Sequence, residues 1–320
     1  MKIVDVEDIA SQLAAHPHNA YFRYLYSDVG RARALFQEHL SAPLAQRMDW
    51  NSLQLLPGSY VKQSLQEIES DLLFSVRVQG GPFMLYVLFE HQSTVDKRMP
   101  QRLLGYMQEI WRTYDKDESL PLTPLLPLVL HQGPDRWTVS VHFEDLFALP
   151  PGLKEHLLPY LPKFSHHLID LSQFDVDKDG RTENGVLLVF MKLARAKQVA
   201  EFFTGRRREL LLPSGLRLIS LLYALNADPS LDVEALVHHI EDEQTKEDLM
   251  STAAALIARG KAEGKAEGEA LGEAKGQLKV LQKMMGQPVS SHAELAALDL
   301  AELQRRYIEL ASVYEQQFKR

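Results

Sequence analysis

The sequence predicts an α/β fold, in which a small mixed β-sheet is flanked by helices and followed by a helical C-terminal extension. Residues 71–78 and 83–89 have the patterns of two strands joined by a tight hairpin. Residues 125–131 are a third apolar run of strand length. Segments with helical spacing precede, separate and follow these strands, an order typical of helices layered on a sheet.

The chain is expected to begin with helices over residues 1–50. Ser27-Asp28 provides an N-cap for a helix whose apolar positions are Ala32, Leu35, Phe36 and Leu40. A short apolar strand then covers residues 53–56 and stops at Pro57-Gly58.

The predicted hairpin follows. Residues 71–78 alternate in the manner of a strand, whereas residues 83–89 are continuously apolar, as in a strand covered on both faces. Gln79-Gly80-Gly81-Pro82 between them is a strong turn signal. We therefore expect these two strands to pair antiparallel.

Further elements follow the hairpin. Pro100 opens a predicted helix with apolar residues at helical spacing, namely Leu103, Leu104, Met107, Trp111 and Tyr114. Residues 137–143 are a candidate for one more strand, and residues 150–180 are rich in turns. The remaining predicted helices of this region cover residues 184–203, 209–226 and 231–258.

Composition excludes several classes of protein. Of the 320 residues 45% are hydrophobic and the net charge is -8, which argues against a disordered chain and against a surface that coats nucleic acid throughout. The chain has no cysteine, so disulfides, thiolate metal sites and cysteine nucleophiles are excluded. No apolar run is long enough to span a membrane, and the N-terminal residues lack a signal-peptide core. The expected location is cytoplasmic.

We expect residues 1–250 to form one domain, and the composition shifts abruptly at Gly260. Residues 251–276 are predicted to be a linker helix rich in Ala, Glu and Lys, with glycines at 260, 264, 268, 272 and 276. A solvated helix that frays and a helix packed closely along its glycines both remain open. Residues 277–320 are predicted to form a small helical module, which is a candidate for homo-oligomer formation.

The hairpin also brings together the residues with the most informative chemistry. If the turn is centred on Gly80-Gly81, paired residue numbers sum to 161, and Asp71 lies opposite Glu90. Gln92 projects from the same face as Glu90. Opposed carboxylates destabilise a sheet unless a cation compensates them, and Mg²⁺ favours carboxylates combined with waters and phosphate oxygens. The alternative is that both acids sit at strand ends and face water.

Several segments, in order along the chain, resemble the recombination-promoting nuclease (Rpn) family, which also carries the description "putative transposase". The resemblance covers roughly residues 16–250. Its motifs are HNAYF at 18–22, LLPGSY at 55–60, SDLLF at 70–74, LFEHQS at 88–93, MP at 99–100 with RLLGYM at 102–107, and LVLHQGP at 128–134. Asn19 departs from the pattern, because the family commonly has aspartate there.

The resemblance implies a PD-(D/E)xK nuclease with a restriction-endonuclease-like core. Asp71 then takes the place of the metal-binding aspartate, Glu90 that of the first acid of the (D/E)xK element, and Gln92 that of its lysine. The main-chain carbonyl of His91 is implied as a further metal ligand. The implied cation is Mg²⁺, with Mn²⁺ and Ca²⁺ as alternatives.

Two groups of residues that follow the (D/E)xK element are candidates for binding DNA. Arg102 and Tyr106 lie one helical turn apart, and we expect them opposite much of the apolar stripe, either in contact with a DNA phosphate or as a solvated surface pair. Arg206-Arg207-Arg208, with Lys192, Arg195 and Lys197, is a second basic cluster with the same two interpretations.

The leading prediction is a Mg²⁺-dependent DNA endonuclease that promotes recombination or is linked to mobile elements. The alternative is a catalytically inactive DNA-binding or assembly protein that keeps the nuclease scaffold. An RNA substrate also remains open.

Overall fold

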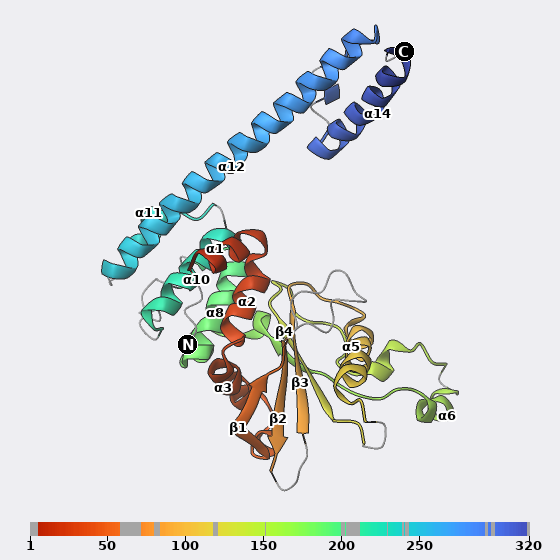
Figure 1. The fold of residues 1–320 in the computed structure, drawn as a ribbon. Helices are drawn as coiled ribbons and strands as arrows, with labels where there is room; N and C mark the ends of the chain where they lie inside the picture. Colours follow the sequence, from red (N-terminus) through yellow and green to blue (C-terminus); the bar gives the residue numbers. More distant parts are fainter. Residues whose placement is uncertain are drawn as a thin grey trace. The chain divides into compact units, whose positions relative to one another are not determined.

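Five strands form the central sheet of the described chain (Figure 1). They lie side by side in the order of the sequence: β1 (Met48–Leu55), β2 (Leu72–Val78), β3 (Met84–Gln92), β4 (Leu125–His131) and β5 (His167–Asp170). The first three are antiparallel, whereas β4 is parallel to β3 and β5 is parallel to β4. The predicted mixed sheet of an α/β fold is therefore confirmed.

The computed structural model divides into two compact units, residues 1–249 and 250–320, and each is described by itself. The described residues are 6–57, 72–79, 84–117, 121–150, 152–199, 202, 212–228, 230–238, 240, 243–291, 294–295 and 298–318. In this part of the chain, no helix combines the length and the apolar content that crossing a membrane requires.

The pairing of β2 with β3 has the predicted register. Leu72 pairs with Phe89 and Arg77 pairs with Met84, so that each pair of residue numbers sums to 161. Asp71 and the turn at residues 80–83 lie outside the described residues. Residues 72–76 of β2 are all buried, because both faces of the sheet are covered by helices.

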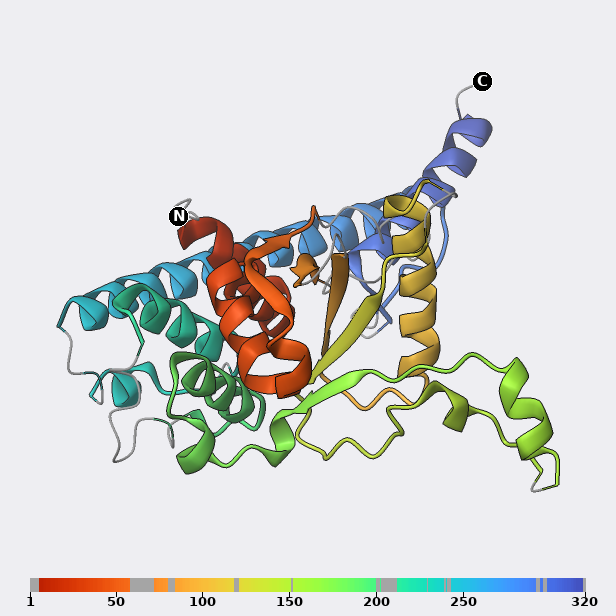
Figure 2. The same cartoon turned by 90° about the horizontal axis from the view of Figure 1, so that it is seen from below.

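One face of the sheet is covered by the N-terminal helices α2 (Pro17–Tyr26) and α3 (Val29–His39). Phe22 of α2 and Phe36 of α3 pack on Phe89 of β3, with ring centroids 4.8 Å and 5.5 Å away. The other helices of this layer are α1 (Val6–Ala15), α8 (Glu183–Arg195) and α10 (Ser214–Ala227). The N-terminal helices and α8 lie on the opposite side of the strands from α5 (Met99–Tyr114), as Figure 2 shows.

The opposite face of the sheet packs against α5. Pro100 lies in the first turn of this helix, as predicted. A buried apolar cluster joins the helix to the strands, and its members include Leu73, Leu88, Met99, Leu103, Tyr106 and Ile110. Leu73 and Leu88 are partners across the hairpin, so the residues that alternate with them in β2 and β3 face the N-terminal helices.

Two predictions about strands are wrong. Residues 137–143 are not a strand: His142 forms an isolated bridge with Ser165, and the 3₁₀ helix η1 (Phe143–Leu146) begins one residue later. The strand β5 lies instead within residues 150–180, where turns were expected. Its four residues are too few for alternation to be recognised, and its position depends on parallel pairing with β4.

The other elements of the first unit are short. The helix α4 (Ala42–Ala45) ends the helical N-terminal segment, and β1 begins at Met48, five residues before the predicted strand. The remaining short helices are α6 (Lys154–Leu157), η2 (Leu158–Tyr160), η3 (Leu171–Gln173), α7 (Val176–Asp179) and α11 (Val233–Val237).

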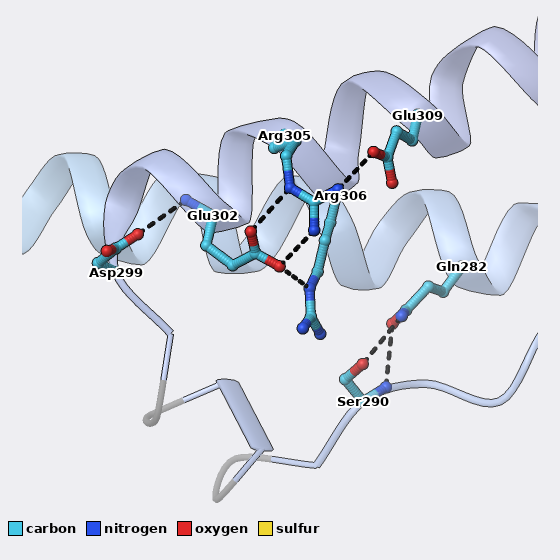
Figure 3. A network of polar contacts seen from close by, with 7 residues as sticks. All are labelled: Gln282, Ser290, Asp299, Glu302, Arg305, Arg306 and Glu309. Carbon is cyan, nitrogen blue, oxygen red and sulfur yellow. Dashed lines mark hydrogen bonds and ion pairs between the residues drawn. The ribbon is translucent and has the colours of Figure 1, made fainter.

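The C-terminal unit contains most of α12 (Glu243–Met284) and all of α14 (Leu300–Phe318). Its core includes Ala274, Leu278, Leu295 and Leu303. Charged and polar side chains on and beside these helices are linked as Figure 3 shows, with Glu302 accepting hydrogen bonds from Arg305 and Arg306. At Gly268, Gly272 and Gly276 an added Cβ would meet no atom within 4 Å, so no neighbouring helix packs closely on these three glycines.

Candidate functional site

The carboxylate of Glu90 is buried near the carboxyl end of β3, on the face that α5 covers. Its Oε1 accepts a hydrogen bond from Nε2 of Gln92 at 2.7 Å and another from Nη2 of Arg102. Its Oε2 is also buried and has no hydrogen-bond partner among the described residues. Glu90 therefore presents one carboxylate oxygen that is desolvated and still free to bind a cation.

Arg102 links Glu90 to a second carboxylate. Its Nη1 donates to Oδ2 of Asp96 at 3.1 Å, and the side chains of Arg102 and Asp96 are 29% and 26% exposed. Asp96 lies in the short segment between β3 and α5, and the first turn of α5 directs Arg102 back toward the strand end. The sequence interpretation missed Asp96, because nothing in its spacing relates it to the hairpin.

Burial raises the pKa of Glu90 to about 7, against the opposing effects of the Arg102 charge and the hydrogen bonds from Gln92 and Arg102. A carboxyl group with such a pKa is partly protonated near neutral pH. A cation that binds to Oε2 would favour the ionised form and would lower this pKa.

Tyr106 corrects one prediction. It was expected opposite the apolar stripe of α5, but it is fully buried in the cluster that joins α5 to the sheet. Burial and the charge of Glu90 raise the pKa of its hydroxyl. The guanidinium of Arg102 lies 6.0 Å from the centre of its ring. Tyr106 thus packs beneath the Glu90–Arg102 pair and has no surface for contact with DNA.

The imidazole of His91 points to the other face of β3, where it is held on both nitrogens. Nδ1 lies 2.9 Å from the side-chain oxygen of Asn19, and Nε2 lies 2.7 Å from Oε1 of Gln132. The ring stacks on Phe22 at a centroid distance of 5.0 Å. These contacts fix the strand between Glu90 and Gln92, and they leave no ring nitrogen of His91 for a metal.

The contacts of Gln132 determine the tautomer of His91. Nε2 of Gln132 donates to the carbonyl of Met191 at 2.8 Å and to the hydroxyl of Tyr223 at 2.6 Å, so its Oε1 must face His91. Burial lowers the pKa of His91 to about 4, and a neutral imidazole has only one donor. The Nε2–H group of His91 therefore donates to Oε1 of Gln132. Its Nδ1 is then an acceptor, so the side-chain amide of Asn19 must be turned over to place its nitrogen, and not its oxygen, beside Nδ1.

A second histidine extends this polar network toward α8. Nδ1 of His18 lies 2.7 Å from the hydroxyl of Tyr223, and Nη1 of Arg195 donates to Nε2 of His18 at 3.0 Å. Burial and the charge of Arg195 lower the pKa of His18 to about 4, which keeps the ring neutral. Asn19, His91 and Gln132 all belong to the motifs found in the sequence, but their contacts cross 41 and 72 positions and follow only from the fold.

Two members of the second predicted basic cluster, Lys192 and Arg195, make contacts within the protein. Nζ of Lys192 donates to the carbonyls of Ser172 and Phe174, and Arg195 binds His18. Both side chains thus bind groups within the protein, while Arg206-Arg207-Arg208 lies outside the described residues.

A divalent cation is compatible with the part of the site that the structure describes. Oε2 of Glu90 is a hard oxygen donor in a desolvated position, which suits Mg²⁺ or Mn²⁺. Among the described residues, no group of three or more His, Asp and Glu side chains could hold a metal. Asp71, the second predicted ligand, lies outside these residues, and with the main-chain carbonyl of His91 it remains a prediction.

Comparison with known proteins identifies relatives for part of the chain. A recombination-promoting nuclease, RpnC, of Escherichia coli (strain K12) is 34% identical over 137 residues, 42% of this chain and 45% of the relative. RpnD of Escherichia coli O157:H7 is 34% identical over 138 residues, 42% of this chain and 52% of the relative. The "inactive recombination-promoting nuclease-like protein RpnE" of strain K12 is 32% identical over 136 residues, 42% of this chain and 45% of the relative.

The chain thus spans about half the length of the curated relatives that it matches. No solved structure matches it significantly. Residues 16–211 match the model of a family described as "Putative transposase, YhgA-like". That match covers more than half of the 320 residues, and together with the Rpn relatives it confirms the resemblance carried by the motifs. The chain therefore belongs to the family described as "Putative transposase, YhgA-like", and it is similar to recombination-promoting nucleases.

Proposed function

We propose that this protein is a metal-dependent DNA endonuclease that hydrolyses phosphodiester bonds and acts in recombination. The observation that carries the proposal is the buried carboxylate of Glu90, whose Oε2 has no hydrogen-bond partner in the described part of the chain. An ionised carboxylate oxygen that is buried without a hydrogen-bond partner is costly, unless a cation or a proton binds it.

Asp71 is the proposed second metal ligand. Its support is the register of the hairpin, in which every described pair from Leu72 with Phe89 to Arg77 with Met84 has the sum 161. The same sum assigns Asp71 to Glu90. The main-chain carbonyl of His91 is the proposed third ligand, and it belongs to the strand that Asn19 and Gln132 hold through the imidazole.

The side chains divide the chemistry between them. A bound Mg²⁺, with Mn²⁺ and Ca²⁺ as alternatives, supplies Lewis acidity and lowers the pKa of a water. Gln92 donates to Oε1 of Glu90 through its nitrogen, which leaves its side-chain oxygen to accept a hydrogen bond from the attacking water. Arg102 balances the charge of Glu90, and its exposed portion would contact the phosphate.

The names of the relatives support the reaction class. Two of them are named recombination-promoting nucleases. The match to the family model, over residues 16–211, includes Glu90 and Gln92. A second candidate function is supported by the relative that is named inactive. In that case, the chain is a DNA-binding or assembly protein that keeps the nuclease scaffold without cutting.

Plasmid cleavage separates the two functions. Supercoiled DNA is incubated with the full chain in EDTA, Mg²⁺, Mn²⁺ or Ca²⁺, in parallel with Asp71→Ala, Glu90→Gln and the control Glu109→Gln. Glu109 pairs with Arg112 on the outside of the same helix that carries Arg102, and its replacement leaves the site intact. Metal-dependent nicking that is lost in the first two variants and kept in the control supports the enzyme. Binding without cutting in every metal supports the inactive scaffold.

A further inference from the structure

A surface cavity of about 490 Å³ lies beside the start of α5. Six residues line it and define what we call the α5–η1 pocket: Lys97, Arg98, Gln101, Phe143, Leu146 and Phe147. Its volume lies within the range of about 300–1,000 Å³ that is usual for sites of small organic ligands. The pocket is therefore large enough for a nucleobase with its sugar.

One wall of the pocket is aromatic and partly open to solvent. Phe143 is buried, whereas Phe147 is 38% exposed, and the centres of the two rings are 5.8 Å apart. The buried ring holds its neighbour in place, so that Phe147 offers a supported aromatic surface to the pocket. Aromatic rings of this kind are what unpaired nucleobases stack on in proteins that bind single strands.

Two other lining residues carry uncompensated positive charge. Lys97 and Arg98 are exposed, and neither side chain has an ion-pair partner among the described residues. The carboxylate of Asp96 beside them is already occupied by Arg102 and by the main-chain nitrogen of Arg98. The acids of η1, Glu144 and Asp145, line a separate cavity together with Lys154 and Lys163.

The pocket adjoins the Glu90 site along the chain. Gln101 of the pocket and Arg102, which binds Glu90, are consecutive residues of α5. Lys97 and Arg98 directly follow Asp96, the second partner of Arg102. The pocket and Arg102 thus both lie at the start of α5.

We infer that the α5–η1 pocket is a nucleotide subsite, in which a base of a single-stranded DNA segment stacks on Phe147 while Lys97 and Arg98 bind its phosphates. The inference rests on the proposed function for the position of the strand, but it concerns binding and requires no cleavage. An enzyme with this subsite would favour DNA in which bases are unpaired next to the cut.

Binding in EDTA tests the subsite without cleavage. The full chain is titrated into a short single-stranded oligodeoxynucleotide that carries 2-aminopurine, whose fluorescence is quenched when it stacks on an aromatic ring. We expect quenching by the unaltered protein, and its loss together with at least about 5-fold weaker binding in Phe147→Ala. Phe147→Leu keeps the apolar contact and the fold, and it should lose the quenching as well.

Charge removal is tested with a matched pair of double variants. Lys97→Ala/Arg98→Ala should weaken binding and reduce the slope of log K against log salt by about 1–2. Lys154→Ala/Lys163→Ala removes the same charge from the separate cavity and should bind as the unaltered protein does. Tyr160→Ala, which removes an aromatic side chain that is 84% exposed elsewhere, is the control for Phe147.

The outcomes distinguish this inference from the proposed function. Cleavage with binding that is insensitive to Phe147 overturns the subsite alone, and it would leave the pocket to an apolar segment of a protein partner. Binding that depends on Phe147 without cleavage in any metal supports the subsite and overturns the enzyme. Equal affinity for duplex DNA and for single-stranded DNA overturns the preference for unpaired bases. The affinity for an RNA oligonucleotide tests whether the subsite prefers deoxyribose to ribose. A chain that binds no nucleic acid overturns both.

Discussion

Arg102 donates a hydrogen bond to the buried carboxylate of Glu90 and is the only cationic side chain paired with it among the described residues. The same guanidinium also binds Asp96. A buried carboxylate needs such a partner, because removal of either member of a buried ion pair leaves an uncompensated charge. Arg102 and a metal ion at Oε2 would therefore compensate the same charge from two sides.

Replacement of Arg102 should reveal this shared role. Arg102→Met keeps much of the apolar stem, and we expect it to lower the free energy of unfolding above neutral pH by about 3 kcal/mol in EDTA. Because a bound cation takes over the compensation, Mg²⁺ should raise the Tm of Arg102→Met by more than that of the unaltered protein. Urea and thermal unfolding with and without Mg²⁺ measure both effects.

Arg112→Met is the matched control for that experiment. Arg112 pairs with Glu109 on the exposed side of the same helix, and its loss should leave stability and the response to Mg²⁺ unchanged. Equal Mg²⁺ responses in the unaltered protein and Arg102→Met would contradict the shared compensation of Glu90.

The stability of the metal-free protein should depend on pH through Glu90. Its pKa is raised from 4.5 to about 7, mainly by burial, so between these values the folded state binds more protons than the unfolded state. The contribution of Glu90 to stability is thus greatest below about pH 4.5 and falls by about 3 kcal/mol as the pH rises through 7. Urea unfolding at a series of pH values, for the unaltered protein and Glu90→Gln, isolates this difference.

The pH profile of the unaltered protein must be compared with that of Glu90→Gln, because several histidines change the free energy of unfolding with pH in the opposite direction. Burial lowers the pKa of His18, His91 and His166 to about 4, so their contribution to stability rises with pH between about 4 and 6.5. These contributions cancel in the comparison with Glu90→Gln. Saturating Mg²⁺ should flatten the remaining dependence, and parallel profiles for the two proteins in EDTA would exclude the raised pKa.

Local sequence patterns were sufficient to predict the elements that position Glu90. The strand at 125–131 has the predicted bounds, the helix after Pro100 begins within one residue, and the register of the hairpin followed from Gly80-Gly81. Each of these depends on neighbours in sequence or on a short turn. For these elements, the residues whose interactions determine the structure are close together in the sequence.

The errors concern residues whose position depends on distant partners. The candidate strand at 137–143 forms only the single bridge of His142 with Ser165, because β5 takes the position next to β4. Tyr106 was assigned to the outer face of α5, but the sheet covers a wider arc of that helix than its leucines indicated. The pairing of Asp96 with Arg102 and of Asn19 with His91 likewise required the assembled fold.

The protonation of His91 should respond to the residue at position 19. In the unaltered protein we expect Nε2 to carry the proton and Nδ1 to accept from the Asn19 amide. Asn19→Asp places a carboxylate beside Nδ1, which should raise the pKa of His91 and protonate both nitrogens. Nitrogen-15 NMR of the imidazole distinguishes the two forms directly.

The same variant tests whether the imidazole positions Glu90. If it does, Asn19→Asp should change the pH profile of DNA cleavage while binding of DNA in EDTA stays unchanged. An Nδ1–H tautomer in the unaltered protein would contradict the orientation assigned to Gln132. Gln173→Glu, an amide-to-carboxylate change at an exposed position, is the control.

Two glycine replacements should affect stability in opposite directions. A Cβ at Gly133, in the HQGP motif, would lie 2.4 Å from Cε1 of His131 and 3.1 Å from the carbonyl oxygen of Ser93. His131 is fully buried, so it cannot move aside without displacing its neighbours, and Gly133→Ala should lower the free energy of unfolding by about 1–3 kcal/mol. Because Ser93 follows Gln92, cleavage should weaken as well.

Gly105 provides the contrasting case within α5. An added Cβ there would meet no atom within 4 Å, so Gly105→Ala should gain helix propensity without a clash. We expect it to raise the free energy of unfolding by about 0.5–1 kcal/mol and to leave cleavage unchanged. Urea unfolding and plasmid nicking of both variants provide the measurement. A Gly133→Ala protein as stable and as active as the unaltered chain would mean that the contact between the HQGP turn and Ser93 does not constrain the site.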